Sequence, residues 1–354
     1  MSSRAAVRRL RAGVVPLEEL ESLSVGYHAV SSLVAARLAA LSRGQPAQPL
    51  FVKGEWGSGK SHLLSFIRAA ASAKTIPVSL IDLNARSAAL NYPQRLYPTI
   101  VENLRCGDAT VGLRGIVLKW LDDSELRERL AKAARMASGM HLSWSVQSLI
   151  ARHENGDNVA LDDSGDWSVL LGADLRWASY GYKRDQALAR LLALASLFHQ
   201  MGLGGITLVL DEAETIDQLA NIRSRVIAYS VLGRLCKMKS VWCAFGVTNR
   251  FDRTIALDVE RGFAGYFSKG EAQFFLDSWY KGSFEAIEPP EVGPSEARAL
   301  AKSIMRLYTA AYGADGTSEG LAKRCLDAWL KNPSRNPRSL IRLLVHELDL
   351  RRPL

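Results

Sequence analysis

A glycine-rich segment, Gly54–Ser61, constrains the fold of this chain more than any other feature. Its sequence, GEWGSGKS, fits the pattern G-x-x-x-x-G-K-[ST] without a mismatch. The short apolar run Leu50–Val52 precedes it, and a helical pattern over residues 60–72 follows it. A strand, a glycine turn and a helix in this order let backbone N–H groups surround a phosphate at the positive end of the helix. The segment therefore predicts a nucleotide-binding α/β domain.

Two residues of this segment have definite chemical roles in such a loop. The Lys60 ammonium can reach the β- and γ-phosphates of a nucleotide, and the Ser61 hydroxyl can coordinate Mg²⁺. The predicted cofactors are therefore ATP and Mg²⁺. The other residues expected at the nucleotide are Gly54, Glu55, Trp56, Gly57, Ser58, Gly59 and His62. Of these, His62 is open to interpretation as a packing residue, and the sequence gives Trp56 no definite role.

A second strand pattern carries acidic residues suited to nucleotide hydrolysis. The strand Thr207–Leu210 is followed directly by Asp211 and Glu212. We expect Asp211 to hold Mg²⁺ through water and Glu212 to polarise the attacking water as general base, with Glu214 as the alternative base. Apolar strands that end in acids are common by chance, so this pattern gains its weight from occurring together with the glycine-rich segment.

A third strand, predicted over Val241–Val247, ends in the polar residues Thr248 and Asn249. A polar side chain at this point would lie between the acidic strand ends and the γ-phosphate. Asn249 is the predicted residue and Thr248 the alternative. The competing interpretation is a strand that simply ends in turn-forming residues.

The order of the predicted elements indicates a parallel α/β sheet, because strands alternate with helices along the chain. A strongly helical region over about 106–180 interrupts this order and is interpreted as an insertion. The predicted strands lie at 76–83, 206–210 and 241–247, and the predicted helices at 17–42 with a break at Gly26, at 113–137, 143–153, 183–201 and 221–238, and as three stretches after residue 294.

The net charge of +9 is concentrated in the terminal segments. Residues 1–11 carry four arginines and no acidic residue, and residues 320–354 carry eight basic and three acidic residues, so the rest of the chain is neutral overall. If the termini converge, they form a basic surface that suits DNA or an acidic partner. The alternative is two solvated faces with no partner.

Other features indicate a cytoplasmic protein. The four cysteines have neither metal-ligand spacing nor the pattern of a disulfide framework. No apolar segment of signal-peptide type follows the first arginines. Residues 191–210 contain no Asp, Glu, Lys or Arg, but His199, Gln200 and three glycines interrupt them, which favours a helix followed by a buried strand over a membrane span.

Five segments together resemble the ATP-binding proteins of BREX-type phage-defence systems, the BrxD-like group. That group is similar to the AAA+ and initiator-like branch of P-loop NTPases, and the resemblance covers most of residues 5–350. The segments are VKGEWGSGKSHLL, LNARSAALNYPQRLYP, GITLVLDEAETID, IRSRVIAY and NPRSLIRLLVHELD. The chain departs from those clades in one respect, because the roughly 15 residues after Arg338 are too few for the winged-helix domain with which they often end.

The resemblance implies further site residues. Asn249 occupies the position called sensor 1 in AAA+ ATPases. Asn336 and Pro337 suit the start of a helix, and Arg338 then matches the sensor 2 arginine, which contacts the γ-phosphate. The alternative for Arg338 is one of several solvated arginines. Candidates for an arginine finger, supplied to a neighbouring subunit, are Arg250, Arg253 and Arg261.

The expected fold is an AAA+ P-loop NTPase core with a parallel sheet, a helical insertion and a C-terminal helical lid. The expected domains are an N-terminal helical extension over 1–47, the core over 48–283 and the lid over 284–354. The expected activity is Mg²⁺-dependent ATP hydrolysis that drives a motor or switch in phage defence, in a homo-oligomer or with other defence subunits. The rival interpretation is a nucleotide-gated scaffold with little or no hydrolysis. A small-molecule kinase is disfavoured by the paired acids, the sensor residue and the lid.

Overall fold

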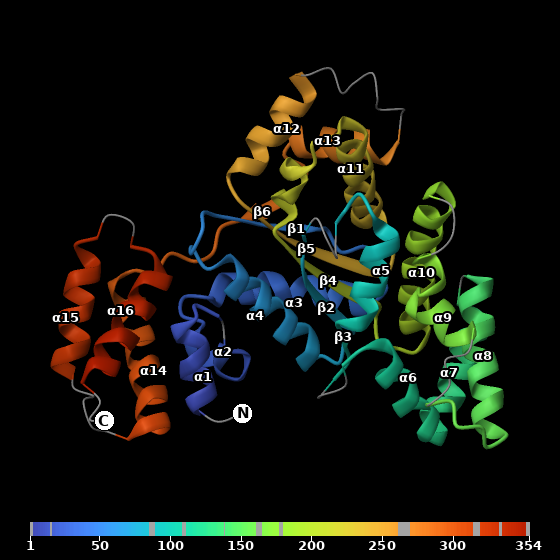
Figure 1. Ribbon diagram of the computed structural model, residues 1–354, viewed down its shortest axis with the longest axis horizontal. Helices are drawn as coiled ribbons and strands as arrows, with labels where there is room; N and C mark the ends of the chain where they lie inside the picture. Colours follow the sequence, from blue (N-terminus) through green and yellow to red (C-terminus); the bar gives the residue numbers. More distant parts are fainter. Residues whose placement is uncertain are drawn as a thin grey trace. The chain divides into compact units, whose positions relative to one another are not determined.

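The structure is a computed structural model (Figure 1), in which the chain forms two compact units. The first unit comprises residues 1–33, 52–69 and 287–354, and the second comprises residues 34–51 and 70–286. The structure describes residues 3–14, 16–84, 89–107, 111–137, 139–160, 165–176, 180–260, 270–313, 319–332 and 335–351.

A six-stranded sheet with the order β3-β2-β4-β5-β1-β6 forms the centre of the second unit. The pairs β2–β4 and β4–β5 are parallel, as predicted, but β3 runs antiparallel to β2. The sheet is therefore mixed and mostly parallel, and the expectation of a parallel sheet holds only in part. The strands are β1 Leu50–Lys53, β2 Val78–Asp82, β3 Leu104–Arg105, β4 Ile206–Asp211, β5 Val241–Val247 and β6 Glu285–Ile287.

The central strands are buried on both faces. Every residue of β4 and β5 is buried, which matches the continuous apolar runs in their sequences. Phe51 at the start of β1 stacks on Phe245 of β5 with ring centroids 4.9 Å apart. The predicted strands at 206–210 and 241–247 are thus confirmed, and Pro77 lies just outside β2, where its missing N–H does no harm.

Helices surround this sheet, and α6 to α9, coloured green in Figure 1, pack against one another and against α5 and α10. Within the predicted insertion the described residues form helices, one 3-10 turn and an isolated bridge between Arg105 and Val111. The predicted helix over 113–137 is two helices, because Asp123 adopts an extended conformation and caps the second by accepting from Leu126 N. The helices are α5 Pro93–Glu102, α6 Leu113–Asp122, α7 Ser124–Met136, α8 Met140–Glu154, α9 Gly165–Leu171, α10 Tyr180–Gln200, α11 Ile222–Lys237, α12 Arg250–Glu260 and α13 Glu271–Tyr280, with 3-10 turns at Asp174–Arg176 and Ala213–Gln218.

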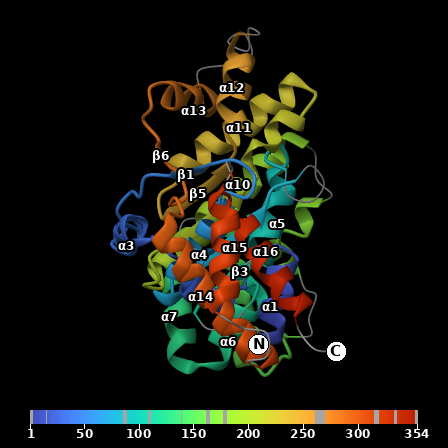
Figure 2. The same cartoon turned by 90° about the vertical axis from the view of Figure 1, so that its left-hand side faces the viewer.

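The first unit is a helical bundle with its own apolar core. Helix α1 packs against α14 and α16, as Figure 2 shows, so the two basic terminal segments lie side by side. The three helices expected after residue 294 are confirmed. The helices are α1 Ser3–Arg11, α2 Leu20–Leu23 after the 3-10 turn Leu17–Glu19, α14 Pro294–Tyr312, α15 Glu319–Leu330 and α16 Pro337–Leu350, while α3 His28–Ser42 and α4 Lys60–Ala73 each run from one unit into the other.

The uncharged stretch over residues 191–210 is the end of α10, a glycine turn and the start of β4, as expected from its sequence. Across the described part of the chain, no helix is long and apolar enough to cross a membrane.

Candidate functional site

The glycine-rich segment lies between β1 and α4, the strand and helix that its sequence predicts. Gly57 and Gly59 adopt positive φ angles of 82° and 108°, which are strained for residues with a side chain. The backbone turns sharply through these two residues and enters α4 at Lys60. The first N–H groups of that helix have no partner within it, which is the usual arrangement at an anion site.

Polar groups with unused hydrogen-bonding capacity lie in this segment. The Lys60 ammonium donates to the carbonyls of Gly54 and Glu55, at 2.7 and 3.2 Å, so the lysine lies along the loop. The Ser58 hydroxyl oxygen is buried and has no hydrogen-bond partner among the described residues. An ammonium, a spare hydroxyl and a helix N-terminus form a donor set that fits a phosphate chain.

Asn336, which precedes α16, is hydrogen-bonded to the same loop. Its Nδ2 donates to the Trp56 carbonyl at 3.1 Å, and its Oδ1 accepts from Arg338 N at 2.8 Å. A Cβ built on Gly57 would lie 2.3 Å from Asn336 Nδ2, so no larger residue fits at position 57 while Asn336 holds the loop. The sequence predicted Asn336 only as a helix cap.

Arg338 lies at the start of α16, as predicted, and its side chain is exposed. Its Nη2 donates to the Gly13 carbonyl at 3.1 Å, just beyond the end of α1. The arginine thus ties α16 to the segment after α1, while its neighbour Asn336 contacts the glycine loop.

His62 packs against the N-terminal helices of the same unit. One ring nitrogen, Nε2, lies 2.9 Å from the Ser24 hydroxyl, and the ring meets Tyr27 edge-on with centroids 5.5 Å apart. Burial lowers the pKa of His62 to about 4, so the ring is neutral at pH 7. These contacts favour the packing interpretation of His62. Trp56, by contrast, is 70% exposed.

The two predicted acids lie in the second unit, at the end of β4. Asp211 is 5% exposed, and its Oδ1 accepts from Glu212 N at 2.9 Å. Glu212 has φ 58° and ψ 37°, a left-handed conformation that costs a residue with a side chain about 1–2 kcal/mol. Strained residues persist where the surrounding structure fixes them, often at functional sites.

Asp82 is a third acid at this end of the sheet, and sequence reasoning missed it. It ends β2 and pairs in register with Asp211 of β4. Burial and the charge of Asp211 raise the pKa of Asp82 above its usual value. The signal was present, because Asp82 also follows an apolar strand.

Thr248 and Asn249 follow β5, as expected, but they differ in burial. Thr248 is 3% exposed, and its hydroxyl has no hydrogen-bond partner in the part of the chain that the structure describes. Asn249 is exposed. Of the arginine-finger candidates, Arg250 and Arg253 are exposed on α12, whereas Arg261 falls outside the described residues.

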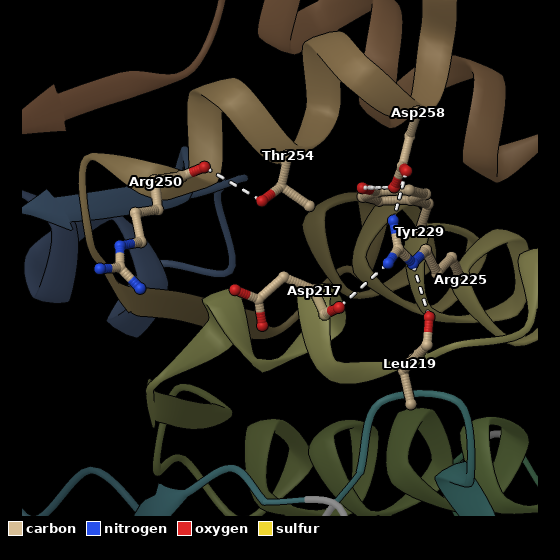
Figure 3. A network of polar contacts seen from close by, with 7 residues as sticks. All are labelled: Asp217, Leu219, Arg225, Tyr229, Arg250, Thr254 and Asp258. Carbon is tan, nitrogen blue, oxygen red and sulfur yellow. Dashed lines mark hydrogen bonds and ion pairs between the residues drawn. The ribbon is translucent and has the colours of Figure 1, made fainter. Parts of the chain in front are cut away.

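Arg225 of α11 joins the segments that follow β4 and β5 (Figure 3). Its guanidinium donates to the carbonyls of Asp217 and Leu219 and forms an ion pair with Asp258 of α12. Tyr229 donates to the other Asp258 oxygen at 2.8 Å. No role for these residues follows from the sequence alone.

The predicted site residues therefore fall into one group in each unit. The glycine loop is in contact with the start of α16 in the first unit, and Asp82 lies beside Asp211 in the second. Among the residues that the structure describes, no three His, Cys, Asp or Glu side chains are arranged to hold a metal ion. Mg²⁺ at a nucleotide site needs only one or two carboxylates besides phosphate oxygens and water, so the metal-binding roles of Asp211 and Ser61 stay predictions.

Comparison with family models of known proteins gives a match. The search of curated proteins found no match to the chain. A family model described as BREX system ATP-binding protein BrxC/D matches residues 1–166, a segment that includes the whole glycine loop. Over these residues the chain is similar to BREX system ATP-binding proteins, in agreement with the resemblance stated from its sequence.

Proposed function

We propose that this protein is a Mg²⁺-dependent ATPase of the AAA+ class that acts as a motor or switch in phage defence. The observation that carries the proposal is the glycine loop, which joins β1 to α4 with Lys60 at the helix start, inside the segment that matches an ATP-binding family. The buried strand β4 also supports it, because an apolar strand that ends in Asp211 and is followed by Glu212 supplies the carboxylates that hydrolysis needs.

The proposed residues divide into those that bind the nucleotide and those that act on the attacking water. Lys60 and the loop N–H groups bind the phosphates. Ser61 and Asp211 would hold Mg²⁺, and the ion would supply positive charge against the phosphate oxygens. Glu212 takes the proton of the attacking water as that water bonds to the γ-phosphorus and ADP departs. Asn249, or the buried Thr248, orients the water or the γ-phosphate.

Purified protein tests the proposal through two measurements, nucleotide affinity with and without Mg²⁺ and release of inorganic phosphate from ATP. We expect ATP binding that depends on Mg²⁺, and turnover. Binding without turnover, with and without duplex DNA, would favour the nucleotide-gated scaffold over the ATPase. No binding would contradict both.

Arg338→Ala should lower ATP turnover more than it lowers ADP affinity. A contact with the γ-phosphate is absent when ADP is bound, so only the ATP complex loses it. Steady-state hydrolysis and ADP titrations measure the two effects. Equal losses for ATP and ADP would instead mean that Arg338 acts through its bond to the Gly13 carbonyl.

The proposed partners are other copies of the chain, further defence subunits and DNA. The arginines of α1 contribute less to a DNA surface than the sequence suggests, since Arg4 donates to Ala311 O and Arg11 pairs with Asp349. Exposed cations recur at four-residue intervals on α14 instead. They are Arg298, Lys302 and Arg306.

If this face of α14 binds DNA, affinity should be insensitive to base sequence and should fall steeply with salt. Replacing Arg298 and Arg306 by Glu should reduce the slope of log affinity against log salt by about 2, since each lost phosphate contact removes roughly 0.9. The same change at Lys132 and Arg135, exposed cations of α7, is the control. Absence of DNA binding at low salt with ATP present would contradict this prediction.

A further inference from the structure

A single guanidinium, that of Arg225, joins its own helix α11 to two further segments of the second unit (Figure 3). Nε donates to the Leu219 carbonyl at 2.7 Å, and Nη2 donates to the Asp217 carbonyl at 3.0 Å. Nη1 donates to the Asp258 carboxylate. The planar fork of arginine suits such a set of divergent acceptors, whereas a lysine ammonium cannot reach all of them at once.

The anchor of this network is a fully buried carboxylate. Asp258 is 0% exposed, and each of its oxygens accepts one hydrogen bond, from Arg225 and from Tyr229. The buried carboxylate is thus paired and hydrogen-bonded, as a charge at that depth requires. Burial and the neighbouring Asp258 raise the pKa of Tyr229, which therefore remains a protonated donor.

The carbonyls that Arg225 holds belong to the segment that begins at Glu212. The 3-10 turn Ala213–Gln218 follows Glu212 directly, and Leu219 ends it. Glu212 has its strained left-handed backbone at the start of this turn, so something must fix the turn in place. Arg225 donates to two carbonyls at the C-terminal end of this turn.

The third segment is α12, which carries Asp258. This helix starts at Arg250, directly after Thr248 and Asn249 at the end of β5. The ion pair therefore connects the helix that follows the proposed sensor to the turn that follows the proposed general base. Both connections run through buried or half-buried groups rather than through solvent.

We propose that Arg225 is a positioning residue for ATP hydrolysis. Through Asp217, Leu219 and Asp258 it fixes the position of α12 relative to the 3-10 turn that follows Glu212, here called the Glu212 turn. The inference rests on the proposed function, in which Glu212 activates water. Arg225 acts through these segments and does not touch the nucleotide. It therefore affects the transition state for hydrolysis and leaves ground-state binding of ATP unchanged.

The test compares two arginines with largely buried side chains, 16% exposed for Arg225 and 10% for Arg190, each of which forms an ion pair with an aspartate. Arg190 donates to both oxygens of Asp174 and to the Val169 carbonyl, but it has no bond to the Glu212 turn or to α12. Arg225→Lys and Arg190→Lys each keep the positive charge but replace the planar guanidinium by an ammonium. We expect Arg225→Lys to lower kcat roughly 10- to 100-fold at unchanged KM for ATP, since small misplacements of a catalytic group cost this much. Arg190→Lys should leave kcat unchanged at a temperature where both variants are folded.

Hydrogen exchange supplies a readout that does not depend on activity. Arg225→Lys should speed exchange of the backbone amides of residues 213–219, and Arg190→Lys should not. Equal losses of kcat in both variants, or unchanged exchange in 213–219, would overturn the proposal. If the unaltered protein hydrolyses no ATP, the proposed function fails, and the exchange measurement alone decides whether Arg225 holds this turn.

Discussion

Glu212→Gln should retain ATP binding and lose nearly all turnover. The substitution keeps the size and hydrogen-bonding reach of the side chain, and it leaves Asp211 and the glycine loop intact. It removes the carboxylate that accepts a proton from water, and a positioned general base is worth about 10²- to 10⁴-fold in rate. Phosphate release at saturating ATP, together with an ATP titration of the same sample, measures the two effects.

Glu214→Gln is the matched control for that experiment. Glu214 lies two residues further along, in the 3-10 turn, and was the alternative base in the sequence analysis. We expect turnover near that of the unaltered protein for Glu214→Gln. Wild-type turnover in Glu212→Gln, with a large loss in Glu214→Gln, would exchange the roles of the two acids.

The elements predicted correctly from the sequence are those with long, regular patterns. Strands β4 and β5 are largely apolar runs of 6 and 7 residues, whereas α10 and α11 have 21 and 16 residues, so length separates strand from helix. The short elements β3 and β6 escaped prediction. A strand of two or three residues at the edge of a sheet carries almost no periodic signal, and its direction depends on the neighbouring strand it pairs with.

The candidate site was predictable where one segment supplies the chemistry. The glycine loop and the pair of acids after β4 are each contiguous, and their residue types follow from the chemistry of phosphate and Mg²⁺. Asn336 and Arg225 could not be found in this way. Asn336 contacts Trp56 across 280 positions of sequence, and Arg225 meets Asp258 across 33, so only the folded chain shows these contacts.

Asp82 falls between these two cases. Its position after an apolar strand is a local signal, but its importance arises from pairing with Asp211 in the sheet. A lone acid at the end of a strand is common, whereas two acids on neighbouring parallel strands share one edge of the sheet. The strand order, which the sequence did not predict, is what distinguishes the two situations.

Lys60→Ala should weaken ATP binding by about 100-fold, because each charge-assisted hydrogen bond to phosphate contributes roughly 1.5–3 kcal/mol and 1.4 kcal/mol is tenfold in affinity. The loss of two such bonds would weaken ATP binding further. However, the ammonium must first give up the Gly54 and Glu55 carbonyls, which it contacts in this structure, so part of the gain is offset.

ADP provides the discriminating comparison for Lys60. If Lys60 contacts both the β- and γ-phosphates, its replacement by Ala removes two contacts from the ATP complex and one from the ADP complex. The substitution should therefore weaken ATP binding more than ADP binding. Lys74→Ala, an exposed lysine just after α4, is the control and should change neither affinity. Thermal unfolding of each variant checks that the loop still folds without the Lys60 bonds. Equal ATP affinity for Lys60→Ala and the unaltered protein would remove the glycine loop as the phosphate site, and with it the basis for placing nucleotide chemistry in this chain.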